Sequence, residues 1–471
     1  MLLRPVFLLL LLAWGTTQPL ACAQNPKPAA PAADSLKPAV RLAWLDSLLN
    51  AAPALRQHQV GLSIADAVTG EVLHEVSEAR YFTPASTMKL LSFYTGLRLL
   101  GDSLPSLRYF SRGDTLFFQG TGDPSFLHGD VPSRRAYNFL AGRPEKMLAY
   151  CDIAAPSAYG PSWAWDDFNY YFQPERTAFP IYGNTVRFYA SAPVPARGKV
   201  PAVPQRVRVL PRNFAPLASA AEAADMLGHD PDVHVMRAQL ENRFTYFPAP
   251  KKWIDEVPFR TSRSLLLRLL GDTLRRAVVN KAWKPRPGRD SIRVLHGLPA
   301  DSLYRRMLRV SDNFLAEQLL LMCATRLGPP RDSLSPYRVI RYARRHLLDS
   351  LPDRLPWVDG SGLSRLNLIT PRSLNALLLR LHREVPERRL LSLLAAGGGQ
   401  GTLRKRYHDA QGTWFWGKTG TLTHTFNLAG YVRTKSGRLL AVSWLNNSIP
   451  GDDQPVRNTM QRILGEVRNR L

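Results

Sequence analysis

Hydrophobic and polar residues along this chain follow two different periods, which predicts a mixture of helices and strands. Apolar residues recur at helical spacing in five segments, namely residues 41–55, 86–99, 262–276, 302–321 and 454–471. Short alternating runs on either side of a turn predict two β-hairpins, 59–65 with 71–76 and 430–434 with 439–444. Glycine stands in both turns, in Thr69-Gly70 and in Lys435-Ser436-Gly437.

The order of these elements predicts the fold class. The two ends of the chain give a helix, two strands, several helices, two or three strands and a closing helix. That order suits an α/β (α+β) fold in which helices flank an antiparallel sheet built from both chain ends. The expected domain comprises residues 38–104 and 253–471. Between them, residues 105–252 are rich in aromatic residues and proline and form an inserted β-rich region of one or two subdomains. Its short β-like runs are 115–119, 185–190 and 207–210.

The first residues resemble an export signal. Arg4 precedes a short apolar run, Val6 to Trp14, and Ala21-Cys22-Ala23 offers a cleavage site between small residues. We therefore expect a signal peptide over 1–23, followed by a Pro- and Ala-rich linker over 24–37. A core helix is the alternative for the first segment, and lipidation of Cys22 is the alternative to its removal. Export predicts a periplasmic or cell-envelope protein.

Charge and cysteine content narrow the partners. The 62 Lys and Arg residues outweigh the 37 Asp and Glu residues and give a formal net charge of +25. This balance favours a polyanionic partner such as anionic lipid or an acidic wall polymer, or simply a soluble surface. Nucleic acid is not an expected partner of an exported protein. Cys151 and Cys323 allow either one disulfide or two buried thiols.

The first candidate for chemistry is Ser86-Thr87-Met88-Lys89. Residues three apart share a face of a helix, so Lys89 is expected to reach the Ser86 hydroxyl. Pro84-Ala85 places Ser86 at the first turn, where free backbone N–H groups favour a developing anion. Taken alone, the segment is far more typical of a surface helix with a serine cap.

Two further triplets have the same ambiguity when each is taken alone. Ser311-Asp312-Asn313 precedes a helical stretch, where it offers a proton-transferring hydroxyl and an amide, or an ordinary helix cap. Lys418-Thr419-Gly420 lies in a strand-like stretch, where Lys418 offers a cation for a substrate carboxylate. Gly420 would allow a substrate to approach the edge strand closely. The order of the three is informative, because Ser311 follows Ser86 by 225 residues and Lys418 follows Ser311 by 107. This trio is typical of β-lactamases and penicillin-binding proteins.

With these motifs the chain resembles a known family, the low-molecular-mass class C penicillin-binding D-alanyl-D-alanine carboxypeptidases/endopeptidases (peptidase family S13). Further segments support the resemblance: Gly122-Asp123-Pro124, Trp163-Ala164-Trp165-Asp166-Asp167, Phe314-Leu315-Ala316-Glu317, Asp359-Gly360-Ser361-Gly362-Leu363-Ser364-Arg365 and Gly401-Thr402-Leu403-Arg404-Lys405-Arg406. Residues 132–159 fit the family poorly. The implied fold is the serine β-lactamase/DD-peptidase type, and the implied substrates are peptidoglycan stem peptides, with β-lactams as covalent inhibitors.

The resemblance implies a role for each motif residue. Ser86 would attack the carbonyl of a D-Ala-D-X bond, and Lys89 would take its proton if desolvation and the neighbouring Lys418 lower its pKa. Ser311 would pass a proton to the leaving amine, and Asn313 would hold the substrate amide and orient Lys89. The N–H groups of Ser86 and Thr421 would form the oxyanion hole. Lys418, Thr419 and Gly420 would bind the end of the substrate.

Several alternatives stay open at this stage. One alternative is a serine β-lactamase, which carries out the same first half-reaction. The other is a non-catalytic wall-binding or penicillin-sensing protein. Asp359 and Arg365 are expected to shape a loop near the site, and Asp123 a turn. The basic run 404–406 would face either the substrate or solvent. A metal site at His229 and His234 is disfavoured, because the spacing is not a strong zinc pattern and the reaction needs no cofactor.

Overall fold

The computed structural model describes residues 42–131, 133–154, 156–193, 195, 204–222, 230–327 and 333–471. By its internal contacts the chain divides into residues 1–37 and residues 38–471, and all described residues belong to the second unit. The predicted signal peptide, the linker, Cys22 and His229 lie outside the described residues. No described helix is long and apolar enough to cross a membrane.

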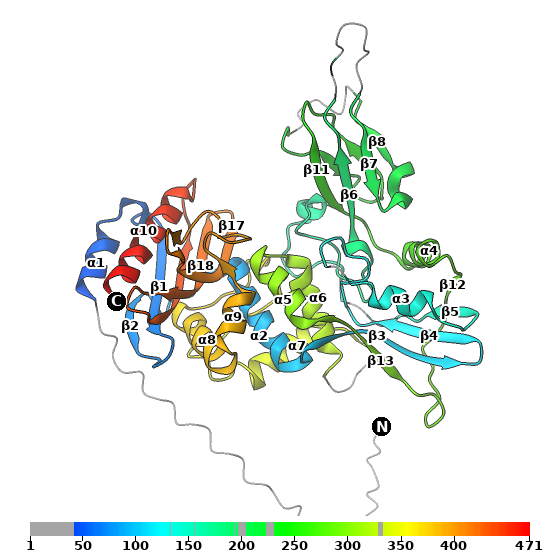
Figure 1. Cartoon of the computed structure of the whole chain (residues 1–471), viewed down its shortest axis with the longest axis horizontal. Helices are drawn as coiled ribbons and strands as arrows, with labels where there is room; N and C mark the ends of the chain where they lie inside the picture. The colour runs from blue at the N-terminus through cyan, green and yellow to red at the C-terminus, as the bar shows by residue number, and fades with distance from the viewer. Residues whose placement is uncertain are drawn as a thin grey trace, which may run out of the picture. The chain divides into compact units, whose positions relative to one another are not determined.

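A six-stranded antiparallel sheet joins the two ends of the chain, as the order of elements predicts (Figure 1). Its strands, from one edge to the other, are β14 (Ala395–Ala396), β17 (Phe415–Leu422), β18 (Thr425–Arg433), β19 (Leu439–Asn447), β1 (Gln59–Asp66) and β2 (Val72–Val76). Both predicted hairpins are confirmed, as β1–β2 and β18–β19. The chain ends meet where β1 pairs with β19, with Leu62 opposite Trp444.

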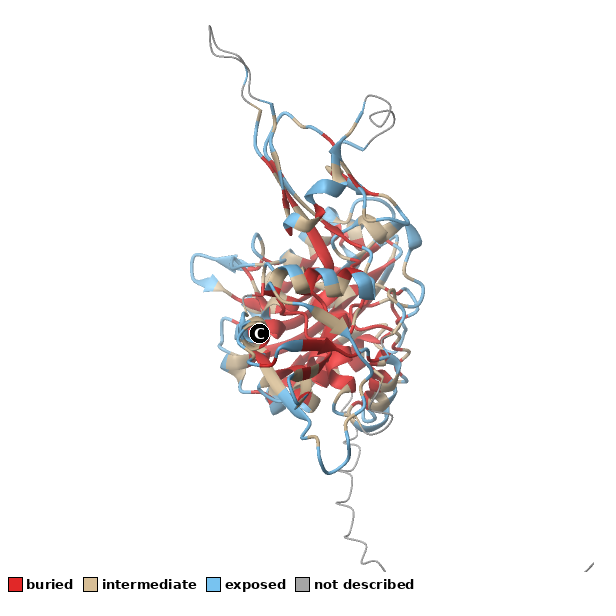
Figure 2. Cartoon of the chain, turned by 90° about the vertical axis from the view of Figure 1, so that its right-hand side faces the viewer, coloured by how far each residue is buried: buried red, intermediate tan, exposed pale blue. Residues whose placement is uncertain are grey.

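Helices cover both faces of this sheet, because its central strands are apolar on both sides. On one face, Leu428 and Trp444 pack with α1 (Ala43–Asn50) and α10 (Gln454–Arg470). On the other face, Tyr431 and Leu445 share a core with a layer of helices. That layer contains α2 (Lys89–Leu100), α5 (Ala300–Arg309), α6 (Asn313–Ala324), α7 (Pro336–His346), α8 (Pro371–Glu384) and α9 (Glu387–Leu393). Figure 2 shows buried strands, in red, enclosed by helices whose outer faces are exposed.

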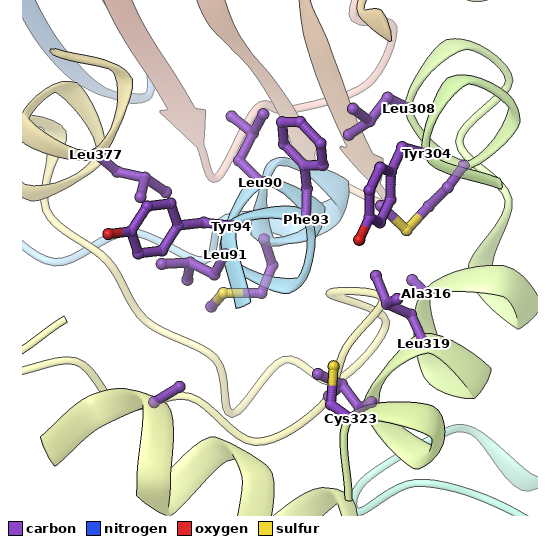
Figure 3. Packing of buried hydrophobic residues seen from close by; sticks show 14 of the residues in the cluster. Leu90, Leu91, Phe93, Tyr94, Tyr304, Leu308, Ala316, Leu319, Cys323 and Leu377 are labelled. Carbon is purple, nitrogen blue, oxygen red and sulfur yellow. The ribbon is translucent and has the colours of Figure 1, made fainter. Parts of the chain in front are cut away.

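Helix α2 lies at the centre of that layer. Its Leu90, Leu91, Phe93 and Tyr94 are buried, and Figure 3 shows them between Leu377 of α8 and the side chains of α5 and α6. Phe93 meets Tyr304 edge to face, with ring centroids 5.0 Å apart. Since every residue from Lys89 to Gly96 is buried, the start of α2 is held in a fixed position.

Residues 302–321 form two helices instead of one. The chain breaks between α5 and α6 at residues 310–312, because Ser311 takes a positive φ of 65° and Asp312 caps α6 by accepting from Leu315 N (3.1 Å). Two other predicted helices begin or end differently: 41–55 divides into α1 and a 3₁₀ turn, η1 (Pro53–Leu55), and 86–99 begins with a 3₁₀ turn, η2 (Ala85–Met88).

The inserted region is β-rich, and the predicted strands at 115–119, 185–190 and 207–210 are confirmed. One sheet has the order β12 (Val278–Asn280), β5 (Met147–Tyr150), β4 (Thr115–Gly120), β3 (Ser103–Arg112), β13 (Arg293–Pro299). A second has β11 (Trp253–Pro258), β6 (Thr185–Ala190), β7 (Val207–Leu210), and a third β8 (Ala218–Ala220), β10 (Phe244–Tyr246), β9 (Val235–Arg237). The other elements here are α3 (Arg135–Ala141), α4 (Arg263–Leu274), η3 (Trp165–Asn169), η4 (Tyr182–Asn184) and η5 (Arg212–Leu217).

The packing extends the inserted region beyond the predicted boundary at Lys252. Leu269 and Leu270 of α4 belong to the same buried cluster as Phe118 and Phe188, and β13 pairs with β3. We therefore place the end of the inserted region at about Pro299. One hydrophobic cluster serves all three sheets, which favours a single unit over two subdomains. Cys151 and Cys323 are both buried free thiols, so the disulfide alternative is wrong.

Candidate active site

The turn that carries Ser86 is clamped between two glycines. A Cβ on Gly362, whose φ is +80°, would overlap the carbonyl of Ala85, so only glycine fits there. On the other side, a Cβ on Gly420 would lie 2.6 Å from Pro84 O and 3.1 Å from Ser86 N. Gly420 thus allows β17 to approach the serine turn. The space that a side chain here would fill is occupied by the backbone of η2, and the expectation that this glycine also makes room for a substrate stays a prediction.

Lys89 lies directly behind Ser86 and is completely buried. Its Nζ donates to Ser86 Oγ (2.7 Å), to Asn313 Oδ1 (2.6 Å) and to the Ser361 carbonyl (2.7 Å). Burial lowers the pKa of Lys89 to about 7, against the opposing effect of the carboxylates of Asp359, Asp312 and Glu317. Near neutral pH a large fraction of Lys89 is therefore a neutral amine within reach of the serine proton.

The second triplet approaches the same point from the break between α5 and α6. Asn313 accepts from Lys89 and donates from Nδ2 to the carbonyl of Phe172 in the inserted region (3.0 Å). Ser311 accepts a hydrogen bond from Lys418 Nζ at 2.8 Å. The three sequence motifs, whose Ser86 and Lys418 are 332 residues apart in the sequence, meet around these few polar atoms.

Lys418 lies deeper than the sequence suggests. It is completely buried, and its Nζ donates to Ser311 Oγ and to the Thr419 carbonyl (2.6 Å). Burial, together with the charge of Lys89, holds the pKa of Lys418 well below its usual range. Burial is the largest cause of the low pKa of both lysines, and the charge of Lys89 lowers the pKa of Lys418 further.

Strand β17 presents a partly free edge to the site. Its neighbour β14 pairs only with Trp416 and Gly417, so among the described residues no strand lies on that side of the stretch from Lys418 to Leu422. Thr419 and Thr421 line the cavity beside this edge. An extended peptide can pair with such an edge by backbone hydrogen bonds.

The cavity has a volume of about 930 Å³ and extends from the serine into the inserted region. Ser86, Ser311, Asn313, Thr419 and Thr421 line its catalytic end. The opposite wall is mostly polar and includes Asp130, Ser162, Asp166, Asp167, Tyr171, Glu256 and Arg365. The inserted region thus forms one wall of the space that a substrate would occupy.

The loop after α7 is shaped by Asp359, as expected. This buried carboxylate accepts from the backbone N–H of Gly362 (2.8 Å) and Ser364 (2.7 Å), and from Trp163 Nε1 (2.9 Å). Arg365 donates to the Thr423 carbonyl (3.3 Å) at the cavity edge. Asp123 is a turn residue, whose carboxylate accepts from Ser125 N and Oγ (both 2.9 Å).

The remaining candidates lie away from this chemistry. Arg406 binds side chains of α10, including Asn458 (2.9 Å), whereas Arg404 and Lys405 are exposed. His234 stacks on Trp253, and the described residues contain no cluster of three metal-ligating side chains. Sequence reasoning did not assign roles to Phe172, Ser361, Arg176 and Glu317. Phe172 and Ser361 accept hydrogen bonds through their backbone carbonyls, and such contacts cannot be predicted from the pattern of side chains.

The fold and the site are those expected of a serine enzyme, with the buried Lys89 Nζ 2.7 Å from Ser86 Oγ. The chain belongs to the D-Ala-D-Ala carboxypeptidase 3 (S13) family, whose model matches residues 42–467. The family predicted from the motifs is thereby confirmed.

Relatives support the same assignment. Carboxypeptidase DacB of Mycolicibacterium smegmatis is 33% identical over 169 residues, which cover 34% of this chain and 36% of that protein. D-alanyl-D-alanine carboxypeptidase DacB of Haemophilus influenzae is 23% identical over 435 residues, 83% of this chain and 86% of that protein. The alignment with the mycobacterial protein therefore spans about a third of its length.

A solved structure shows the same fold. The crystal structure of penicillin binding protein 4 from Haemophilus influenzae has a TM-score of 0.70 at 20% identity and covers 90% of this chain and 99% of that one. The same protein complexed with a β-lactam has a TM-score of 0.64 at 18% identity. The predicted fold class is confirmed.

Proposed function

We propose that this protein cleaves the peptide bond after a D-Ala carbonyl in peptidoglycan stem peptides, through an acyl-enzyme on Ser86. The observation that carries the proposal is the 2.7 Å contact between Lys89 Nζ and Ser86 Oγ, with burial lowering the lysine pKa to about 7. Serine is a weak nucleophile without an adjacent base, and this arrangement supplies one at neutral pH. Family membership supports the choice of substrate.

The proposed acylation step uses the residues in order. Lys89 takes the Ser86 proton as Oγ bonds to the carbonyl carbon, and the backbone N–H groups of Ser86 and Thr421 stabilise the oxyanion. The C–N bond then breaks, and Ser311 passes a proton to the departing amine. Ser311, which Lys418 Nζ holds at 2.8 Å, recovers its proton from Lys89, so Lys89 is a neutral amine again before deacylation. A donor in such an oxyanion hole is worth about 3–4 kcal/mol.

Deacylation returns the enzyme to its starting state. Water attacks the ester carbonyl, its proton passes to Lys89, and the released Ser86 oxygen takes a proton back. An amine in place of water would give transpeptidation. Because Lys418 is buried, we propose that Thr419 and Thr421 contact the substrate's carboxylate, while Lys418 holds Ser311 and the Thr419 carbonyl from behind them.

Export is the second part of the proposal. We propose that residues 1–23 act as a signal peptide and that the mature protein works in the periplasm or cell envelope, with lipid on Cys22 as the alternative to its removal. The family's wall substrate supports this location. The mass of the mature N-terminal peptide would distinguish cleavage from lipidation.

The test is incubation of the purified protein with uncross-linked and cross-linked muropeptides, followed by mass analysis. Loss of one terminal D-Ala from the uncross-linked peptide supports carboxypeptidase action. Separation of dimers into monomers supports endopeptidase action. Release of neither product, with stable binding to the wall, would refute the proposal in favour of a non-catalytic wall-binding protein. Rapid hydrolysis of penicillin alone would favour a β-lactamase.

A further inference from the structure

A buried ion pair joins the inserted region to the helix behind the active site. Arg176 of the inserted region and Glu317 of α6 meet at 3.2 Å, and their side chains are 5% and 1% exposed. Arg176 also donates to the carbonyls of Tyr159 (2.7 Å) and Ser157 (3.0 Å), and its guanidinium lies over the Trp163 ring. A buried pair is a weak source of net stability, because desolvation offsets most of the attraction. Its position suggests another role.

Glu317 leads from this pair to the catalytic lysine. Its second carboxylate oxygen accepts from Ser361 N at 2.7 Å. The carbonyl of the same Ser361 accepts from Lys89 Nζ at 2.7 Å. Arg176, Glu317, Ser361 and Lys89 thus form a continuous chain of polar contacts. A shift of the Glu317 carboxylate would therefore move the acceptor that holds Lys89.

The charges around Lys89 come from three elements. Asp312 and Glu317 face it from α6, Asp359 from the loop that precedes α8, and Lys418 from β17. The three carboxylates favour the charged ammonium form of Lys89, which cannot accept a proton. Arg176 forms an ion pair with Glu317 and so offsets one of these three negative charges. Trp163, also from the inserted region, donates to Asp359 at 2.9 Å.

We propose that Arg176 is a positioning residue through which the inserted region sets the pH range in which Lys89 can activate Ser86. Neutralising Glu317 lowers the negative potential at Lys89, and fixing Glu317 holds the Ser361 carbonyl in place. This inference rests on the proposed function, because it requires Lys89 to be the base. It gives the inserted region a part in the chemistry in addition to its place in the cavity wall.

The test measures how fast a fluorescent penicillin acylates the protein from about pH 5 to about pH 9, the range in which a lysine of lowered pKa titrates. For Arg176→Gln we expect the midpoint of the acylation profile to rise by about one pH unit, the scale of one partly screened charge at this depth. Below the midpoint, acylation would then be about tenfold slower. Arg176→Lys keeps the charge and should keep the midpoint.

Glu317→Gln changes the same potential in the opposite direction. It removes a negative charge while its amide oxygen can still accept from Ser361, so we expect the midpoint to fall. This variant tests the same link if Arg176→Gln does not fold. Arg237→Gln is the matched control: Arg237 is a buried arginine of the inserted region that donates to the carbonyls of Pro258 (2.8 Å) and Ala238 (2.9 Å). Its loss should leave the midpoint unchanged.

Two results would overturn the inference. One is a folded Arg176→Gln protein with the wild-type midpoint, whatever its maximal rate, because that describes a purely structural pair. The other is an equal shift in Arg237→Gln or Arg176→Lys, because the effect would then not come from the charge on Glu317. A wild-type protein that is never acylated would instead refute the proposed function.

Discussion

Replacement of Gly420 by alanine adds a single methyl group where the two halves of the active site meet. The new Cβ would lie 2.6 Å from Pro84 O, 3.0 Å from Thr87 N and 3.1 Å from Ser86 N. All three neighbours are backbone atoms, so no side-chain rotation can relieve the contact. Either β17 or the turn that carries Ser86 must move.

The size of the movement sets the expected effect. An ordinary C···O contact is about 3.3 Å or longer, so the strand and the turn must separate by about 0.7 Å. Overpacking of this kind costs about 1–3 kcal/mol of unfolding free energy. A displacement approaching 1 Å between reacting groups lowers rates by about a hundredfold. Since Ser86 N and Thr421 N lie on opposite sides of this contact, we expect acylation to slow by about that factor.

The assay combines urea unfolding with the second-order rate constant for acylation by a fluorescent penicillin. Gly465→Ala is the matched control, because Gly465 lies in α10 and an added Cβ would meet no atom within 4 Å. This control should keep the acylation rate and gain up to about 1 kcal/mol from higher helix propensity. A folded Gly420→Ala protein that acylates at the wild-type rate would refute the reasoning that this contact aligns the site.

Three further results are expected. Acylation of the wild-type protein should fall as the pH drops below about 7, because protonated Lys89 cannot take the Ser86 proton, and a rate independent of pH down to about 5 would contradict this. Asp359→Ala should lower the unfolding free energy by at least about 2 kcal/mol, since four donors lose their acceptor, and an unchanged urea midpoint would count against it. Arg372 holds the pKa of Asp353 at about 2. The pair therefore stabilises the fold at any pH above the ordinary pKa of aspartate, and this stabilisation is lost as the pH falls towards 2. The stability difference between wild type and Arg372→Gln should therefore shrink over that acid range, and a constant difference would exclude the linkage.

The local features of this molecule could be predicted from sequence because short-range rules decide them. Alternation around Thr69-Gly70 fixed the first hairpin, and the pairing of β1 with β19 followed from the order of elements. The three motifs were recognisable by residue type and order. The break at Ser311 was not, since the apolar period continues across it and only the left-handed backbone of Ser311 and the cap at Asp312 separate α5 from α6.

What the sequence could not reveal depends on long-range contacts. Lys418 is as polar as any surface lysine, and only the packing of β17 against η2 shows that it is buried. A glycine at position 420 indicates that another group approaches the strand closely, but the sequence does not show whether that group is a substrate or another part of the chain. Arg176 pairs with a residue 141 positions further on, and nothing near either residue indicates that contact. The sequence does not reveal that α4 packs with the inserted region, because its ordinary amphipathic pattern fits either core.

The most direct test of the central claim is the site of covalent labelling by a β-lactam. The wild-type protein would be treated with penicillin and digested, and the mass of each peptide measured. We expect one adduct, on the serine of the peptide that contains Ser86 and Lys89, and none in Ser86→Ala. A Ser86→Ala protein that still acquires the adduct, or a wild-type adduct on Ser311 or any other residue, would contradict the assignment of Ser86 as the nucleophile.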